Sequence, residues 1–134
     1  MMSHSPPLDL ADYEAALERR AGGNLSADEV ASLLGITFQA VDERRRAQSL
    51  LAIRRGDGWI YPRAQFHGNG TVPCLAAVVE GLDASGPWVT LEFIITPDGV
   101  LDGLSPREAL LSGGDMLDRV MTVVCGHREG EGFT

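Results

Sequence analysis

The sequence predicts a mainly α-helical protein, in which a helix-turn-helix with a small β-hairpin wing is followed by a second helical part. The first observation is the very short turn between two amphipathic segments, 25–35 and 38–49, which makes the two helices cross steeply. The second is the alternation of apolar and polar residues over 51–61 around Gly56-Asp57-Gly58, which is typical of a β-hairpin. The third is the helical spacing of apolar residues beyond residue 70, between Pro and Gly breaks.

Three parts are expected along the chain. Residues 1–23 form an N-terminal tail and one short helix, residues 24–70 the winged helix-turn-helix, and residues 71–134 a helical part with a flexible C-terminal tail. The 134 residues are 44% hydrophobic, which excludes a disordered chain and suffices for one domain with its own core. No apolar run reaches the roughly 20 residues of a membrane-spanning helix. With two cysteines and no signal-like start, we expect a cytoplasmic protein that does not contact membranes.

Charge is distributed unevenly along the chain. The net charge is −8, and all 11 basic residues are arginine. Residues 24–66 hold six arginines against five acidic residues, whereas residues 67–134 hold three against ten. An acidic body with one local basic patch is compatible with DNA binding, which a uniformly acidic protein is not. A solvated helix end explains the patch equally well, so charge alone leaves both interpretations open.

The helix-turn-helix carries the clearest local signals. Ser26 and Glu29 are spaced as a capping box at the start of its first helix. Gly35 supplies a left-handed stop, and Thr37 follows as the N-cap of the second helix. In DNA-binding proteins of this geometry, the second helix enters the major groove.

On a helical wheel, the arginines of the second helix are not equivalent. Arg44 lies toward the first helix, which indicates a structural role, whereas Gln39 and Arg46 point away from it. Arg forks onto guanine and Gln onto adenine, so these two residues are best placed to contact bases. Arg45 is then expected on a phosphate. The alternative for Arg46 is an ion pair with Asp42, four residues earlier.

The hairpin extends the basic segment. Arg54 and Arg55 lie near its tip and Arg63 at its foot, where contacts with the DNA backbone or minor groove are expected. The alternative is that these side chains are merely solvated. The residues expected to contact DNA are Gln39, Arg45, Arg46, Arg54, Arg55 and Arg63.

The C-terminal part reads as a series of short helices. Pro73 opens a helix over 74–82, and residues 88–95 fit either a strand or a fully buried helix. Ser105 and Glu108 form a second capping box, with Pro106 at the first helical position. Asp115 is expected to cap the last helix. The glycine-rich tail 126–134 is expected to be mobile.

Motifs for catalysis or cofactor binding are not found. The sequence has no glycine-rich phosphate motif, no nucleophile motif and no metal-ligand spacing. We therefore expect a protein that is not an enzyme and that needs no metal or cofactor.

Two stretches of sequence, taken together, point to a family. The first runs from Leu25-Ser26-Ala27-Asp28-Glu29 to Gly35, and through the hairpin to Tyr61-Pro62-Arg63-Ala64-Gln65-Phe66. The second comprises Thr96-Pro97, Leu101, Gly103, Ser105-Pro106-Arg107-Glu108-Ala109-Leu110 and Gly113. Over residues 24–130 this pairing resembles antitoxins of the Xre/MbcA/ParS family, whose toxin-binding domain carries a Thr-Pro, Leu-x-Gly, x-Pro-x-x-Ala-Leu pattern. Asp98 departs from the pattern, in which Asn is common, and the N-terminal unit is closer to a MerR-like winged helix.

The resemblance implies an antitoxin of a type II toxin–antitoxin pair. Such a protein dimerises, binds and blocks a RES-domain toxin that acts on NAD, and represses its own operon by binding operator DNA. It also implies that residues 88–95 are helical and that the C-terminal part blocks the active site of the toxin. The excess of acidic residues over 67–134 suggests in addition that the acidic tail enters a positively charged pocket of the toxin. The residues expected to contact the toxin are Thr96, Pro97, Leu101, Gly103, Ser105, Pro106, Arg128, Glu129 and Glu131.

Two alternatives stay open. One is a stand-alone MerR- or excisionase-like transcriptional regulator whose C-terminal half only dimerises. The other is a winged helix that no longer binds DNA and serves as an interaction module.

Overall fold

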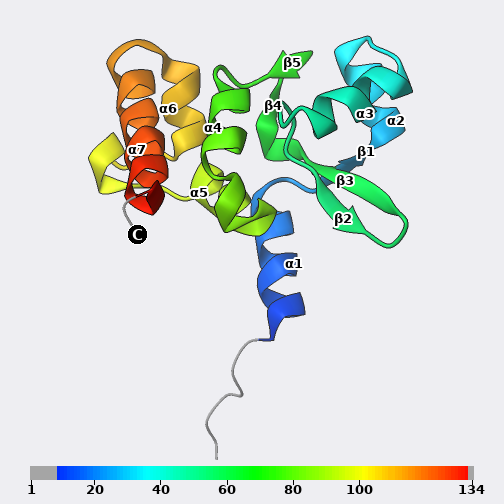
Figure 1. Cartoon of the computed structure of the whole chain (residues 1–134), viewed down its shortest axis with the longest axis horizontal. Coiled ribbons are helices and arrows are strands. Elements are labelled where there is room, and N and C mark those ends of the chain that lie inside the picture. Colours follow the sequence, from blue (N-terminus) through cyan, green and yellow to red (C-terminus); the bar gives the residue numbers. More distant parts are fainter. Residues whose placement is uncertain (1–8, 133–134) are drawn as a thin grey trace, which may run out of the picture.

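A computed structural model describes the backbone of residues 9–132 and the side chains of residues 9–126. The fold is mainly α-helical with two small antiparallel sheets, as predicted (Figure 1). Its α-helices are α1 (Leu10–Arg20), α2 (Ala27–Leu34), α3 (Phe38–Arg46), α4 (Leu75–Gly81), α5 (Pro87–Ile95), α6 (Pro106–Ser112) and α7 (Gly114–Gly132). Its strands are β1 (Asn24–Ser26), β2 (Ile53–Arg55), β3 (Gly58–Pro62), β4 (Phe66–His67) and β5 (Gly70–Thr71), and its 3₁₀ helices are η1 (Arg63–Gln65), η2 (Asp83–Ser85) and η3 (Gly99–Leu101).

The helix-turn-helix forms from local hydrogen bonds that the sequence predicts. Ser26 Oγ accepts from the Glu29 amide at 3.1 Å, and Glu29 Oε1 accepts from the Ser26 amide at 2.8 Å. Gly35 ends α2 with φ of +67°, a conformation that a Cβ would strain. Thr37 Oγ1 then accepts from the Ala40 amide at 3.0 Å and starts α3. The capping box and the tight turn are confirmed.

Helix α3 ends earlier than predicted. It stops at Arg46 rather than near Ser49, because Gln48 takes a left-handed conformation with φ of +61°. The Gln48 amide donates to the Arg45 carbonyl at 3.1 Å, and the Ser49 amide donates to the Arg44 carbonyl at 2.9 Å. This is the bonding of a Schellman motif, which glycine usually closes. With Gln in that position, no local signal predicts that the helix ends there.

The hairpin is part of a three-stranded sheet. Strands β2 and β3 pair antiparallel across Gly56-Asp57, with Arg54 opposite Trp59, so the predicted wing is confirmed. Strand β1 pairs with the other edge of β3, with Leu25 opposite Tyr61, and this third strand was not predicted. It ties the start of α2 to the hairpin and gives the sheet order β1-β3-β2.

The C-terminal half contains helices α4 to α7. Residues 87–95 form helix α5, the alternative that the resemblance implies. The second capping box is confirmed, since Ser105 Oγ accepts from the Glu108 amide at 3.1 Å. The prediction for Asp115 was wrong: α7 begins at Gly114, and Asp115 lies in its first turn.

Residues 126–132, which the sequence analysis assigned to a glycine-rich tail outside the last helix, continue α7. Extending an existing helix adds one hydrogen bond per residue, and this segment contains no proline to stop it. The side chains of Arg128, Glu129 and Glu131 lie outside the described residues, as do residues 133–134.

One connected hydrophobic core runs through the winged helix and the C-terminal helices. Two polar contacts also join distant elements. The Tyr13 hydroxyl of α1 donates to Glu92 Oε1 of α5 at 2.7 Å. Arg107 of α6 donates to the Ala64 carbonyl at 2.7 Å and to the Phe66 carbonyl at 2.9 Å. The winged helix is therefore held against the C-terminal helices by both apolar and polar contacts.

Candidate nucleic-acid interface

Trp59 joins helix α3 to the hairpin. The guanidinium carbon of Arg45, on α3, lies 4.4 Å from the centre of the Trp59 ring, and that of Arg54, on β2, lies 5.3 Å from it. A guanidinium over an indole face is attracted by the ring's quadrupole. The stack therefore fixes the helix and the wing relative to each other, with positive charge at their junction.

Asp42 organises the arginines of α3. Its carboxylate pairs with Arg45 three residues later and with Arg46 four residues later. The hydrogen bond from Arg45 is the main cause that lowers the pKa of Asp42, so the carboxylate stays ionised at neutral pH. The Arg46–Asp42 pair that the sequence offered as an alternative to base contact is thus present. A pair at the protein surface is weak and exchanges readily for a phosphate or base contact.

The roles of Arg44 and Arg45 are reversed relative to the helical-wheel prediction. Arg44 is exposed, whereas the Arg45 side chain is only 17% exposed and packs on Trp59. The Arg46 side chain is 69% exposed, as predicted. The wheel failed because it included only the helix-turn-helix, and the surface that covers Arg45 comes from β3. Arg44, and not Arg45, therefore has the exposed side chain that the sequence analysis expected to contact a phosphate.

The first turn of α3 presents two exposed side chains. Gln39 is exposed as predicted, and its neighbour Phe38 is 57% exposed. Sequence analysis did not single out Phe38, although an aromatic residue directly after an N-cap is a usable signal. Large aromatic groups in this position are suited to contact the methyl group of thymine.

The hairpin arginines are less free than predicted. Arg54 Nε donates to the Gly56 carbonyl at 3.0 Å, within the hairpin itself. Arg55 pairs with Glu18 of α1 and keeps 51% of its side chain exposed. Both arginines remain exposed residues, so they are accessible to a phosphate if these contacts open.

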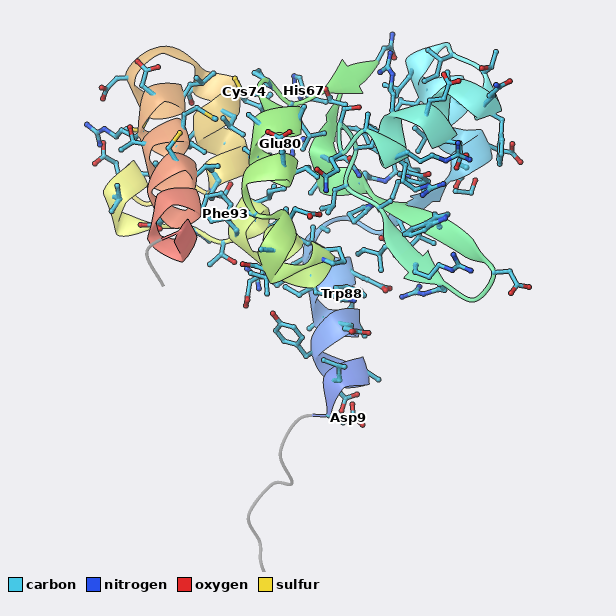
Figure 2. All side chains as sticks on the ribbon, in the orientation of Figure 1. Asp9, His67, Cys74, Glu80, Trp88 and Phe93 are labelled. Carbon is cyan, nitrogen blue, oxygen red and sulfur yellow. The ribbon has the colours of Figure 1, made fainter. Side chains whose placement is uncertain are left out.

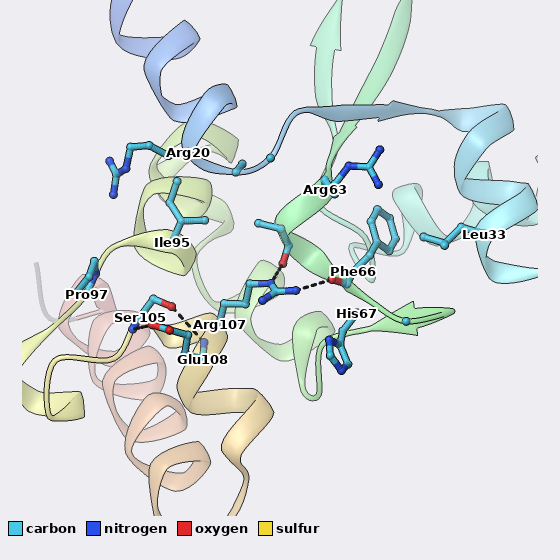
Figure 3. Close-up of a pocket in the computed structure, with 14 residues that line it drawn as sticks. Arg20, Leu33, Arg63, Phe66, His67, Ile95, Pro97, Ser105, Arg107 and Glu108 are labelled. Atoms are coloured by element: carbon cyan, nitrogen blue, oxygen red, sulfur yellow. Dashed lines mark hydrogen bonds between the residues drawn. The ribbon is translucent and has the colours of Figure 1, made fainter.

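Arg63 belongs to a different surface. It follows β3 directly, at the foot of the hairpin, but lines a cleft of about 570 Å³ with Arg20 and Arg107 (Figure 3). Among the described residues that line this cleft, none comes from α3, β2 or β3. The structure thus groups Arg44, Arg45, Arg46, Arg54 and Arg55 around α3 and the hairpin, and separates Arg63 from them.

The residues predicted to contact a toxin divide by exposure. Pro97 and Gly103 are exposed, and Thr96 is half-buried, with its hydroxyl accepting from Arg20 at 3.0 Å. Leu101, Ser105 and Pro106 are buried, so their side chains serve the fold: Leu101 in the core and the other two at the start of α6. The expectation that these three present a docking surface is corrected accordingly.

Among the described residues, no group of three or more His, Cys, Asp or Glu side chains is placed to hold a metal ion. Within the same part of the chain, no helix has the length and apolar character to cross a membrane. Figure 2 shows His67 and Cys74 near the same end of the molecule.

No protein-family model and no curated protein matches the chain. A solved structure, the NMR structure of Rv2175c, is similar to it, with a TM-score of 0.58 and 21% sequence identity. The similarity covers 96% of this chain and 88% of that chain. At this identity it concerns the fold, and it extends over the winged helix and the C-terminal helices together.

Proposed function

We propose that the protein binds double-stranded DNA through its winged helix, with α3 in the major groove and the β2–β3 hairpin against the backbone. The observation that carries this proposal is the stack of Arg45 and Arg54 on Trp59. The stack holds α3 and the hairpin in a fixed geometry. These two elements together carry five of the chain's 11 arginines. Fixed spacing between a helix and a wing is what groove recognition requires.

Individual side chains then have distinct roles. Arg46 and Gln39 face outward from α3 and are suited to read base edges. Arg44, exposed on the same helix, and Arg54 on the hairpin are suited to phosphates. Arg45 is a positioning residue, because its guanidinium is already engaged by Asp42 and Trp59.

Substitution of single arginines tests this proposal. We expect Arg46→Ala to weaken binding to DNA from the protein's own promoter by about 1–3 kcal/mol and to relax the preference at one base pair. The control is Arg119→Ala, an arginine of α7 whose side chain is 40% exposed and which lies in the acidic half. Fluorescence anisotropy with promoter DNA and with a scrambled duplex measures both effects.

The double variant Arg54→Ala, Arg55→Ala should behave differently. It should weaken binding to all sequences alike and lower the slope of log affinity against log salt by about one to two, because phosphate contacts release counterions. A wild-type protein whose DNA affinity does not depend on salt would contradict the proposal and favour a winged helix that only mediates protein contacts.

A second candidate function is that of an antitoxin for a RES-domain toxin, and the proposed DNA binding would then serve repression of its own operon. The surface of the C-terminal half favours it. Val100 is 58% exposed beside the exposed Gly99 and near Pro97, in a part of the chain with three arginines against ten acidic residues. An apolar spot on an acidic surface fits a partner with a basic pocket for an anionic dinucleotide.

Co-expression distinguishes the two candidates. If a RES-domain protein encoded next to this chain arrests growth, we expect this protein to restore growth and to co-purify with the toxin. Val100→Glu should abolish the rescue and leave DNA affinity unchanged. Rescue that survives both Val100→Glu and a truncation after Val124 would place the inhibitory surface elsewhere. The absence of any toxin interaction would leave a stand-alone regulator of the MerR or excisionase type.

A further inference from the structure

A cleft lies where the winged helix meets the C-terminal helices. Its volume is about 570 Å³, within the range of small-molecule sites. One side is built by the end of α1, η1 and β4, and the other by the end of α5 and the start of α6. Figure 3 shows Arg107 in the middle of the cleft, with Arg20 and Arg63 at its two edges and their side chains extending in opposite directions. The cleft is therefore a junction of the two halves with a cationic lining.

The three arginines of the cleft are not neutralised by carboxylates. No described carboxylate lies within the 4.0 Å of an ion pair from Arg20, Arg63 or Arg107. Arg20 bonds only the Thr96 hydroxyl, and Arg107 bonds only backbone carbonyl groups. In a chain with net charge −8, three such guanidiniums around one cleft constitute an unbalanced positive site.

The one carboxylate that lines the cleft is engaged elsewhere. Glu108 Oε1 accepts from the Ser105 amide at 2.9 Å and caps α6. That backbone hydrogen bond is the main cause that lowers the pKa of Glu108. Its charge is therefore directed mainly at the helix N-terminus, where it is stabilised by the helix dipole, and the nearby charge of Arg107 is a smaller cause of the lowered pKa.

We propose that this cleft binds a small molecule that carries a phosphate group, such as a mononucleotide. Guanidinium groups pair with phosphate in a planar, two-pronged geometry. A dianionic phosphate balances the charge of several arginines better than a single carboxylate does. The buried Phe66 and the half-buried Ile95 give the remaining wall an apolar surface for the uncharged part of the ligand.

The phosphate of a small molecule fits the cleft better than a phosphate of DNA. Among the described lining residues, none belongs to the recognition helix or to the strands of the hairpin. A bound ligand would instead contact both halves of the chain, through Arg63 and His67 on one side and Arg107 on the other. It would therefore stabilise their junction.

An NMR titration of the full chain tests the proposal, with AMP as the probe and adenosine and citrate as comparison ligands at constant ionic strength. We expect saturable shifts of the backbone amides of Gly22, His67 and Gly68 with AMP. Adenosine, without the phosphate, should bind at least about tenfold more weakly, since charge-assisted hydrogen bonds are lost. Citrate should bind more weakly than AMP. Shifts that are absent with AMP, or equal with adenosine or with citrate, would overturn the proposal.

Paired variants provide the control. Arg20→Gln with Arg63→Gln removes two exposed cleft arginines and should weaken AMP binding by about tenfold or more. Arg19→Gln with Arg119→Gln removes the same charge from positions that do not line the cleft and should leave AMP binding unchanged. Equal loss in both double variants would show a general charge effect. Loss of DNA affinity in the cleft variant, with no AMP binding by the wild type, would assign these arginines to DNA. Either result would overturn the proposal.

Discussion

The Gln65 side chain makes the hydrogen bonds that a neighbouring strand would otherwise make to Leu51, in the segment between α3 and β2. Its side chain is fully buried. Oε1 accepts from the Leu51 amide at 2.7 Å, and Nε2 donates to the Leu51 carbonyl at 2.7 Å and to the Pro62 carbonyl at 3.1 Å. One amide group thus satisfies both backbone groups of a buried residue, and it holds the loop after the recognition helix against η1.

Removal of this amide should be costly. We expect Gln65→Ala to lower the free energy of unfolding by about 3 kcal/mol, because it leaves a buried N–H and a buried carbonyl of Leu51 unpaired and opens a cavity. Urea denaturation followed by circular dichroism measures the change. Gln39→Ala, at an exposed position of α3, is the control and should change stability by less than about 0.5 kcal/mol. A similar value for the two variants would contradict the assigned role.

At the scale of residues, the sequence predicted what depends on near neighbours. Ser26 with Glu29 and Ser105 with Glu108 are each three residues apart, so their capping boxes follow from spacing alone. The partners of Gln65 and Arg107 lie up to 43 residues away, and no local pattern connects them. The stack on Trp59 belongs to the same class, which is why Arg44 and Arg45 were given each other's roles.

At the scale of elements, α4 and α7 pack closely because a glycine lies at their contact. Gly81 is buried, and a Cβ added there would overlap Cγ1 of Val124. Valine on a helix is held in one rotamer and cannot move aside easily. We therefore expect Gly81→Ala to lower the free energy of unfolding by about 1–3 kcal/mol, although alanine is the better helix former.

Gly126→Ala is the matched control for this prediction. Gly126 also lies in a helix, but nothing stands within 4 Å of an added Cβ. The substitution should raise stability by up to about 1 kcal/mol through helix propensity alone. Thermal unfolding of both variants gives the comparison. Stabilisation by both substitutions would mean that α4 and α7 do not pack as closely as described.

Two carboxylates with lowered pKa values, Glu108 and Asp42, make the stability of the protein depend on pH. Hydrogen bonds lower the pKa of Glu108, first through the Ser105 amide, and that of Asp42, first through Arg45. A carboxyl group with a lowered pKa in the folded state stabilises the protein above its unfolded pKa, and this stabilisation is lost as pH falls through the folded value. Stability should therefore decline below about pH 4, near the ordinary pKa of these groups.

Glu108→Gln separates this effect from the cap itself, since glutamine preserves the capping geometry but does not titrate. Its stability should fall less steeply than that of the wild type between neutral pH and about pH 3. Asp118→Asn, at an exposed position of α7, is the control and should follow the wild-type curve. A Glu108→Gln curve with the wild-type slope would show that this carboxylate does not contribute.

Several helix ends that are marked by a capping box or by glycine could be predicted from the sequence. Ends and strands without such a local marker could not. Helix α3 ends at Arg46 because Gln48 takes the left-handed conformation, and no glycine at that position predicts it. Strand β1, only three residues long, forms because β3 offers a free edge, and such pairing has no local signature. The continuation of α7 to Gly132 was missed because three glycines in the segment suggested a coil.

At the scale of the whole molecule, the division of the chain into a winged helix and a C-terminal half coincides with a division of its charge. The basic residues gather on α3 and the hairpin, whereas the acidic residues dominate α4 to α7. If the winged helix binds DNA as proposed, the acidic half would repel the DNA and favour the orientation in which the winged helix faces it. The same division leaves the C-terminal half available for a partner of opposite charge, whether a toxin or a second copy of the chain.

The last prediction concerns self-association. Helix α1 carries an apolar stripe that the structure covers only in part: Leu17 is 1% exposed, and Tyr13 is half-buried and bonded to Glu92. Leu10 remains 68% exposed on α1 and Val89 remains 45% exposed on α5, the helix that α1 contacts. Helix α1 projects from the body of the molecule (Figure 1), which makes this surface accessible to a second copy.

A dimer through this surface would present two recognition helices to a two-fold operator. We expect light scattering at micromolar concentration to give twice the chain mass of 14.4 kDa. Leu10→Glu should return the protein to the mass of one chain and weaken operator binding, because the two half-sites are then bound independently. Val100→Glu, an exposed apolar residue of η3, should leave the mass unchanged. A wild-type protein with the mass of a single chain would contradict the dimer, and it would require the winged helix to recognise its DNA as a monomer.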